Sequence, residues 1–167
     1  MAGAPLISRT ASPATAGVVE DAVQLVTFYL GGEEYALGIT RVREIIGTAG
    51  TTRLPHSPRH VMGLINLRGE VIPVFDMRRW FGLATSLTEA KSTIIAEWRD
   101  ERFGFTVDAV HQVVWLRRDA IDPPTTHFQE RSPYIMGLGK YQNRILILLD
   151  LDSLFKDVEE EAQSLKG

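Results

Sequence analysis

Apolar and polar residues alternate along much of this chain in short runs that are separated by turn-forming residues, a pattern typical of β-strands. Two such runs, 25–30 and 34–39, flank the pair Gly31-Gly32. Two glycines between alternating runs favour a tight hairpin turn, because glycine adopts positive φ without steric cost. The pattern therefore predicts a β-hairpin near the start of the folded chain.

The apolar spacing changes after this hairpin. Val42, Ile45 and Ile46 fall at positions i, i+3 and i+4, Thr40 is a good N-cap residue, and Gly47 follows. Apolar residues at this spacing between a cap and a glycine indicate an amphipathic helix. We therefore predict a short helix over 40–46, whereas the corresponding later stretch is richer in β-branched residues and is compatible with a strand.

A second hairpin is predicted from the runs 61–67 and 70–75, which are joined by Arg68-Gly69. Pro73 interrupts the second run. Because proline has no amide hydrogen to donate to a β-ladder, Pro73 is expected at a sheet edge or beside a bulge.

The chain repeats itself internally. Residues 62–81 align without gaps on residues 136–155, at a constant offset of 74 residues, and residues 35–46 align on 103–114 at an offset of 68. In both copies of the first block an aspartate, Asp76 or Asp150, precedes a short apolar helix pattern, where it would serve as an N-cap. The second helix is compatible with an extension through the acidic segment 157–161. Repetition of two blocks in the same order predicts two copies of one structural unit.

Many short strands with tight turns, present twice, favour two small β-barrels, because closing a small sheet removes its unpaired edges. We predict a flexible tail at 1–22, a first barrel at about 23–86, a second at about 87–156, and a helix end or tail at 157–167. Lobes this small bury too little surface to fold alone, so they are expected to share a core. The pattern leaves open whether they exchange strands.

Composition narrows the possible functions. With 18 basic and 21 acidic residues among 167, the net charge of −3 argues against a nucleic-acid partner. The absence of cysteine excludes disulfides and thiolate chemistry and fits a cytoplasmic location. The apolar run at 145–149 is far shorter than the roughly 20 residues that cross a bilayer, so no direct membrane insertion is expected.

No recognisable catalytic motif is present. The sequence contains no G-x-S-x-G elbow and no glycine-rich phosphate loop. His56 and His60 have the spacing of two zinc ligands on a helix, but Pro55 and Pro58 prevent a helix there, so a polar loop is favoured. His111 follows the alternation of a strand face. We therefore expect no enzyme activity, no metal and no cofactor.

Four stretches of this sequence together resemble the CheW family. They are residues 34–37, 42–47, 53–55 and 63–76, and the last contains Asn-Leu-Arg-Gly followed by an apolar strand with proline. The resemblance covers about residues 23–155. It implies a mainly β fold of two SH3-like five-stranded β-barrels related by a pseudo-twofold repeat, with short helices and a C-terminal helix.

The resemblance also implies a function and a set of partners. Family members are cytoplasmic, non-catalytic adaptors that couple chemotaxis receptors to the histidine kinase CheA in two-component signal transduction. They bind the cytoplasmic helical hairpin of the receptor in the groove between the barrels, bind the regulatory domain of the kinase, and reach the membrane receptor arrays through these partners. No cofactor is implied.

Site residues follow by position. The resemblance makes Val42, Glu44, Arg68 and Gly63 candidate receptor contacts, with Gly63 at a position whose backbone tolerates no side chain. On physical grounds alone, Arg68 at a hairpin tip is either a solvated charge or a partner contact. The kinase contact is expected to be an exposed apolar patch, and Ile46 is its candidate, since a short helix cannot bury all three of its apolar residues.

Two alternatives remain open at the level of sequence. A paralogous coupling protein of a non-motility pathway, such as surface sensing or pilus control, would carry the same fold and groove. A small-molecule sensor or hydrolase would instead use the groove between the lobes, with His111 or the carboxylates as its polar groups.

Overall fold

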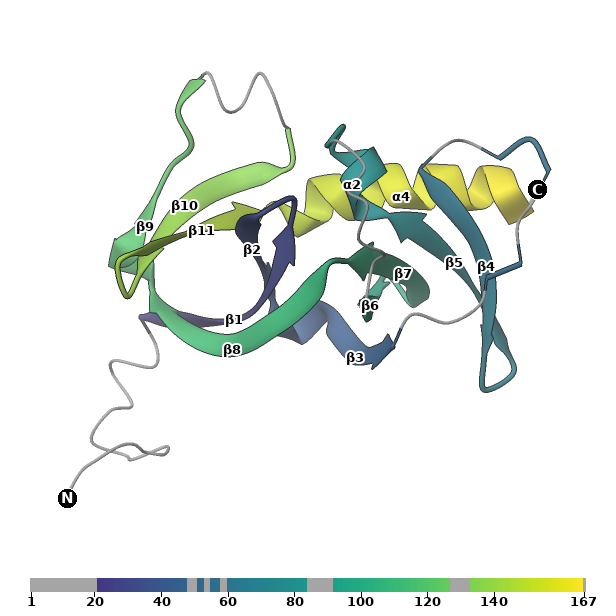
Figure 1. The fold of residues 1–167 in the computed structure, drawn as a ribbon, viewed down its shortest axis with the longest axis horizontal. Helices are drawn as coiled ribbons and strands as arrows, with labels where there is room; N and C mark the ends of the chain where they lie inside the picture. The colour runs from purple at the N-terminus through teal and green to yellow at the C-terminus, as the bar shows by residue number, and fades with distance from the viewer. Residues whose placement is uncertain are drawn as a thin grey trace.

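The computed structural model describes residues 21–47, 51–52, 55–57, 60–83, 92–126 and 133–166. Within them the chain is mainly β and forms two sheets, with helices packed along one side (Figure 1). The first sheet has the order β8-β1-β2-β11-β10-β9 and the second the order β3-β6-β7-β5-β4. The strands of the first sheet are β1 (Ala22–Leu30), β2 (Glu33–Gly38), β8 (Ala109–Arg117), β9 (Ile121–Asp122), β10 (Ile135–Tyr141) and β11 (Arg144–Leu149). Those of the second are β3 (Val42–Gly47), β4 (Val61–Leu67), β5 (Glu70–Asp76), β6 (Ser92–Trp98) and β7 (Glu101–Val107).

Two α-helices and two short 3₁₀ turns complete the described elements. They are α2 (Met77–Trp80), α4 (Leu151–Lys166), η2 (Ile39–Arg41) and η3 (Arg118–Ala120). The predicted extension of the last helix through 157–161 is confirmed. No helix among the described residues is long and apolar enough to span a membrane.

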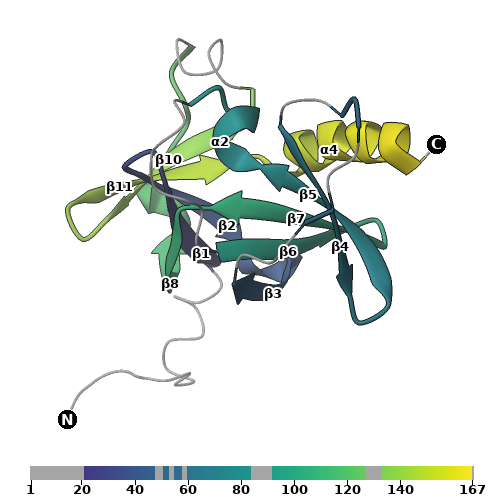
Figure 2. The same ribbon diagram turned by 45° about the vertical axis from the view of Figure 1, so that its right-hand side comes forward.

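Each sheet combines strands from both halves of the chain (Figure 2). The hairpin β1–β2 joins the first sheet, where β1 pairs with β8 and β2 runs parallel to β11. The hairpin β6–β7 joins the second sheet, where β6 pairs with β3 and β7 runs parallel to β5. The predicted boundary between residues 86 and 87 lies outside the described residues, and the sheets do not follow it, because each half contributes a hairpin to the other half's sheet.

The internal repeat is present in the structure. Strands β4 and β5 correspond to β10 and β11 at the offset of 74, and each hairpin is bulged at the same place, between Val61 and Gly63 and between Ile135 and Gly137. An α-helix follows each of these hairpins directly. The predicted pseudo-twofold relation between two β units is therefore confirmed.

The predicted turns and caps are also confirmed. The turns at Gly31-Gly32, at Arg68-Gly69 and at Gln142-Asn143, which is equivalent to Arg68-Gly69 in the repeat, have φ between +47° and +87° at both residues, as type I′ turns require. The turn at Arg99-Asp100 was not predicted and has the same geometry. Asp76 accepts a hydrogen bond from the amide of Arg78 at 3.0 Å, and Asp150 accepts one from the amide of Ser153 at 3.3 Å. These predicted turns and caps form from residues that are close in the sequence, which is why the sequence predicts them.

Pro73 lies where its missing amide hydrogen is tolerated. It pairs with Leu64, one position from the bulge, and the parallel ladder with β7 begins only at Val74. The expected location beside a bulge is confirmed.

The predicted helix over 40–46 is wrong. After the turn η2, residues 42–47 form β3 and pair with β6. Val42 and Ile46 share one face in a helix and also in a strand, so only Ile45 could distinguish the two structures. In a strand Ile45 lies on the opposite face, and β3 leaves it exposed. The β-branched residues and the ladder with β6 favour the strand.

The main core lies between the two sheets and includes residues of both. Phe28 and Leu37 of the first sheet pack in one buried cluster with Phe75 and Phe105 of the second and with Phe155 of α4. Two smaller clusters each lie within one sheet. The expectation that the two lobes share a core is therefore confirmed.

Candidate functional site

Glu44 and Arg68 form a two-pronged ion pair. The Nη1 and Nη2 atoms of Arg68 donate to Oε1 and Oε2 of Glu44 at 2.7 and 2.8 Å. Arg68 lies at the tip of the β4–β5 hairpin, and Glu44 lies on β3. Because β3 and β4 stand at opposite ends of the strand order, the pair links the two outer strands of a curled sheet.

This ion pair contributes little to folding. The side chains of Arg68 and Glu44 are 69% and 32% exposed, and exposed pairs stabilise a fold by about 0–1 kcal/mol. Its main effect is on conformation, because two parallel hydrogen bonds hold the planar guanidinium in one orientation. The structure thus presents an oriented arginine on the surface.

Further ion pairs surround Glu44 and Arg68. Glu44 and Arg68 line a depression of about 350 Å³, whose lining also includes Arg43, Glu70 and Arg102. Arg102 bonds Glu70, and this hydrogen bond, followed by the charge of Glu70, raises the pKa of the guanidinium. The remaining lining residues are Leu67 and Ile95.

This arrangement does not resemble a hydrolytic site. Each arginine and glutamate that lines the depression is in an ion pair with a neighbouring side chain, and a general base needs an accessible proton acceptor held next to a nucleophile. The geometry fits recognition of charged groups on another molecule.

Val42 and Gly63 lie on the two elements that carry the ion pair. Val42 is half-buried on β3, two residues before Glu44, and packs against the main core. Gly63 is buried in β4 at the bulge, with φ of +145°, a conformation that residues with side chains rarely adopt. Of the four predicted receptor contacts, the structure joins Glu44 and Arg68 directly, and it places Val42 on the strand of Glu44 and Gly63 on the strand that leads to Arg68.

Ile46 is less exposed than its proposed role suggested. It is half-buried and packs against the small cluster inside the second sheet, whereas its neighbour Ile45 is 42% exposed. The helix on which the choice of Ile46 depended is a strand, so alternate residues of β3 face outward. As a kinase contact, Ile46 remains a prediction.

His111 belongs to a polar cluster that sequence analysis missed. Glu34, with a side chain only 5% exposed, bonds His111 Nδ1 at 2.8 Å and accepts from Arg144 Nε at 3.0 Å. Burial raises the pKa of Glu34, but the hydrogen bonds with His111 and Arg144, together with the charge of Arg144, outweigh burial and lower it. The cluster ties β2 to β8 and β11.

The structure gives His60 a packing role. Its ring lies 4.4 Å from the ring of Trp80 and 6.3 Å from that of Phe75, between centroids. His56 is exposed in a turn. No group of three or more potential metal ligands occurs among the described residues.

Comparison with known proteins agrees with this geometry. The model of the CheW-like domain family matches residues 24–159. The chain is 33% identical over 161 residues to the chemotaxis protein CheW of Klebsiella aerogenes, covering 95% of this chain and 93% of that protein. It is 30% identical over 138 residues to CheW of Helicobacter pylori, covering 82% and 84% of the two chains.

A solved structure supports the same assignment. The scaffolding protein TtCheW from Thermoanaerobacter tengcongensis superimposes with a TM-score of 0.71 at 31% identity, over 76% of this chain and 88% of that one. The family match and the relatives span most of the chain, and the structural similarity extends to both β units. The chain therefore belongs to the family of CheW-like domain proteins, non-catalytic coupling adaptors of chemotaxis.

Proposed function

We propose that this adaptor binds the cytoplasmic helical hairpin of a chemoreceptor and the regulatory domain of a CheA-type kinase, and thereby holds the kinase in receptor arrays. It acts in the cytoplasm and reaches the membrane through its partners. The observation that carries the proposal is the exposed Arg68, oriented by Glu44 on the hairpin tip.

An oriented arginine suits recognition of a helix. The guanidinium has five N–H donors, of which Glu44 engages two, so other donors remain for a partner's carboxylate or carbonyl oxygens. Because the side chain is already ordered, binding loses less conformational entropy than it would with a free arginine. Val42 supplies apolar contact beside this polar group, and the bulge at Gly63 sets the direction of the hairpin.

The kinase contact is proposed on β3 around Ile46. The accessible part of Ile46 is small, so exposed Ile45 next to it would provide much of the apolar surface. Apolar side chains exposed on a sheet are suited to contact with another folded domain.

The receptor contact is tested by replacing Arg68 with glutamate. The variant should no longer co-sediment with receptor-bearing membranes, because the new carboxylate would repel Glu44 and the guanidinium donors would be lost, while far-ultraviolet circular dichroism stays unchanged. Arg117→Glu is the matched control. Arg117 lies on the first sheet, its side chain is 54% exposed, and it is paired with Asp119. The binding of this control should equal that of the unmodified chain.

A charge exchange separates recognition from local structure. In Glu44→Arg/Arg68→Glu the ion pair can form again with its ends reversed, so the fold is restored but the arginine no longer occupies the hairpin tip. Binding should stay lost. Unchanged binding in the single variant, or full recovery in the double one, would remove Arg68 from the receptor site.

A further inference from the structure

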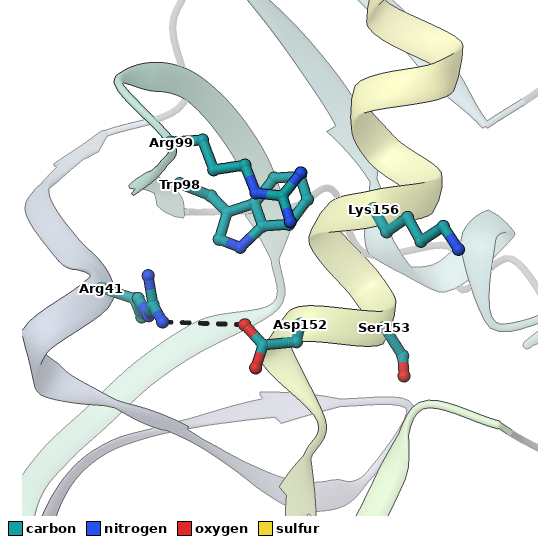
Figure 3. Close-up of a pocket in the computed structure, with 6 residues that line it drawn as sticks. All are labelled: Arg41, Trp98, Arg99, Asp152, Ser153 and Lys156. Atoms are coloured by element: carbon teal, nitrogen blue, oxygen red, sulfur yellow. Dashed lines mark ion pairs between the residues drawn. The ribbon is translucent and has the colours of Figure 1, made fainter.

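A second depression lies where η2, the β6–β7 turn and the start of α4 meet (Figure 3). Its volume is about 550 Å³, and none of its lining residues belongs to the depression around Arg68. The lining consists of Arg41, Trp98, Arg99, Asp152, Ser153 and Lys156.

Positive charge exceeds negative charge in this depression. Three cations face one carboxylate, a local charge of +2 in a chain of net charge −3. Within the described part of the chain, Asp152 forms one ion pair, with Arg41 at 3.6 Å. Among the residues that the structure describes, neither Arg99 nor Lys156 forms an ion pair with a carboxylate.

One of these cations, Arg99, is held by the surrounding structure. The guanidinium carbon of Arg99 lies 4.2 Å from the centroid of the Trp98 ring, and this cation–π contact restrains the side chain. Trp98 is itself buried against Phe155 of α4. The amide of Ser153 is already bonded by the Asp150 side chain, so the positive character comes mainly from the side chains rather than from the helix end.

The internal repeat shows that such a depression is not an automatic product of the fold. At the offsets of the repeat, Arg99 corresponds to Gly31 and Asp152 to Arg78. In that half, Arg78 bonds Asp108 at 2.5 Å with both side chains largely buried, and Asp108 also accepts from the amide of Gly31 at 2.9 Å. The equivalent place is therefore occupied by an internal ion pair, and only the second copy leaves cations without carboxylate partners among the described residues.

We propose that this cationic depression binds an acidic peptide segment of a partner protein, at a site separate from the receptor contact. Figure 3 shows Arg41 and Arg99 on one side of α4 and Lys156 directed away from them on the other. Cations that are spread out in this way do not converge on one small anion. They fit carboxylates placed along an extended chain, with Arg99 and Lys156 each binding one of them.

The test uses the full chain and a fluorescein-labelled hexaglutamate peptide, with hexaglutamine as the uncharged control probe. Fluorescence anisotropy should show that hexaglutamate binds and hexaglutamine does not. The affinity for hexaglutamate should fall as salt is added. Arg99→Asn/Lys156→Gln should raise the Kd about tenfold, since two exposed ion pairs are lost. Asparagine is chosen because it tolerates the positive φ of residue 99.

The matched control removes two cations elsewhere. Arg117→Asn/Lys140→Gln changes the net charge equally on the first sheet and should leave the Kd within about twofold. Equal weakening in both double variants would show diffuse attraction and overturn the proposal, as would absence of binding or stronger competition by inorganic phosphate than by unlabelled peptide. Arg68→Glu should bind the peptide normally, so this test is independent of the receptor proposal.

Discussion

Replacing Phe155 with alanine should destabilise the whole protein, because its ring joins α4 to the core that the two sheets share. Phe155 is fully buried. Its ring centroid lies 6.2 Å from that of Trp98, 6.5 Å from that of Phe103 and 5.9 Å from that of Phe105. Alanine would leave a cavity that these rigid rings cannot readily fill.

The size of the loss follows from that burial. Truncation of a buried phenylalanine costs about 3–5 kcal/mol, from lost transfer free energy and from the cavity. We expect about 4 kcal/mol here, a large part of the roughly 5–15 kcal/mol that stabilises a typical domain. At about 2–4 °C per kcal/mol for a chain of this size, Tm should fall by roughly 8–16 °C.

Urea unfolding measures this change. Circular dichroism and tryptophan fluorescence should report one coincident transition, because a core built from both sheets makes them a single cooperative unit. The control is Ile145→Ala, on a side chain that is 62% exposed, with an expected change within about 0.5 kcal/mol. A loss below about 1 kcal/mol for Phe155→Ala, or two separate transitions, would refute the reasoning.

Two further perturbations probe other contacts. In Gly139→Ala the new Cβ would lie 2.5 Å from Cδ2 of Leu116, so thermal melting should show a loss of about 1–3 kcal/mol, and an unchanged Tm would contradict the packing. The pKa of Glu34 is lower in the folded state than in the unfolded state, so the unfolded state binds the proton more readily. The ionised Glu34 therefore stabilises the fold above about pH 4.5, and this stabilisation is lost as the pH falls toward the folded-state pKa. Glu34→Gln, which keeps the shape but cannot ionise beside Arg144, should show a shallower decline of urea midpoint between about pH 5 and pH 3, and an identical decline in both proteins would count against the ion pair.

The features predicted from sequence are those that nearby residues determine. The turn at Arg68-Gly69, the cap at Asp76 and the bulge beside Pro73 each depend on a few neighbouring positions. The repeat was also detectable, because its two copies retain the same order of such signals. The six-residue segment at 42–47 was assigned wrongly because it is too short to distinguish a helical period from a strand period without knowledge of its partner β6.

Long-range pairing could not be predicted in the same way. The exchange of β1–β2 and β6–β7 between the sheets depends on contacts between strands far apart in the chain, and no local pattern encodes them. The same holds for side chains, since Glu34 meets Arg144 across 110 residues. Arg68 was identified by family resemblance, but its orientation by Glu44 became visible only in the folded sheet.

The coupling function is tested most directly by asking whether the chain bridges two proteins that do not bind each other strongly. Receptor-bearing membranes, purified CheA-type kinase and the chain are mixed, and the kinase that sediments with the membranes is measured. We expect kinase in the pellet when the unmodified chain is present and little when the chain is omitted or carries Arg68→Glu. Equal amounts of sedimented kinase with and without the chain would contradict its role as the coupling adaptor.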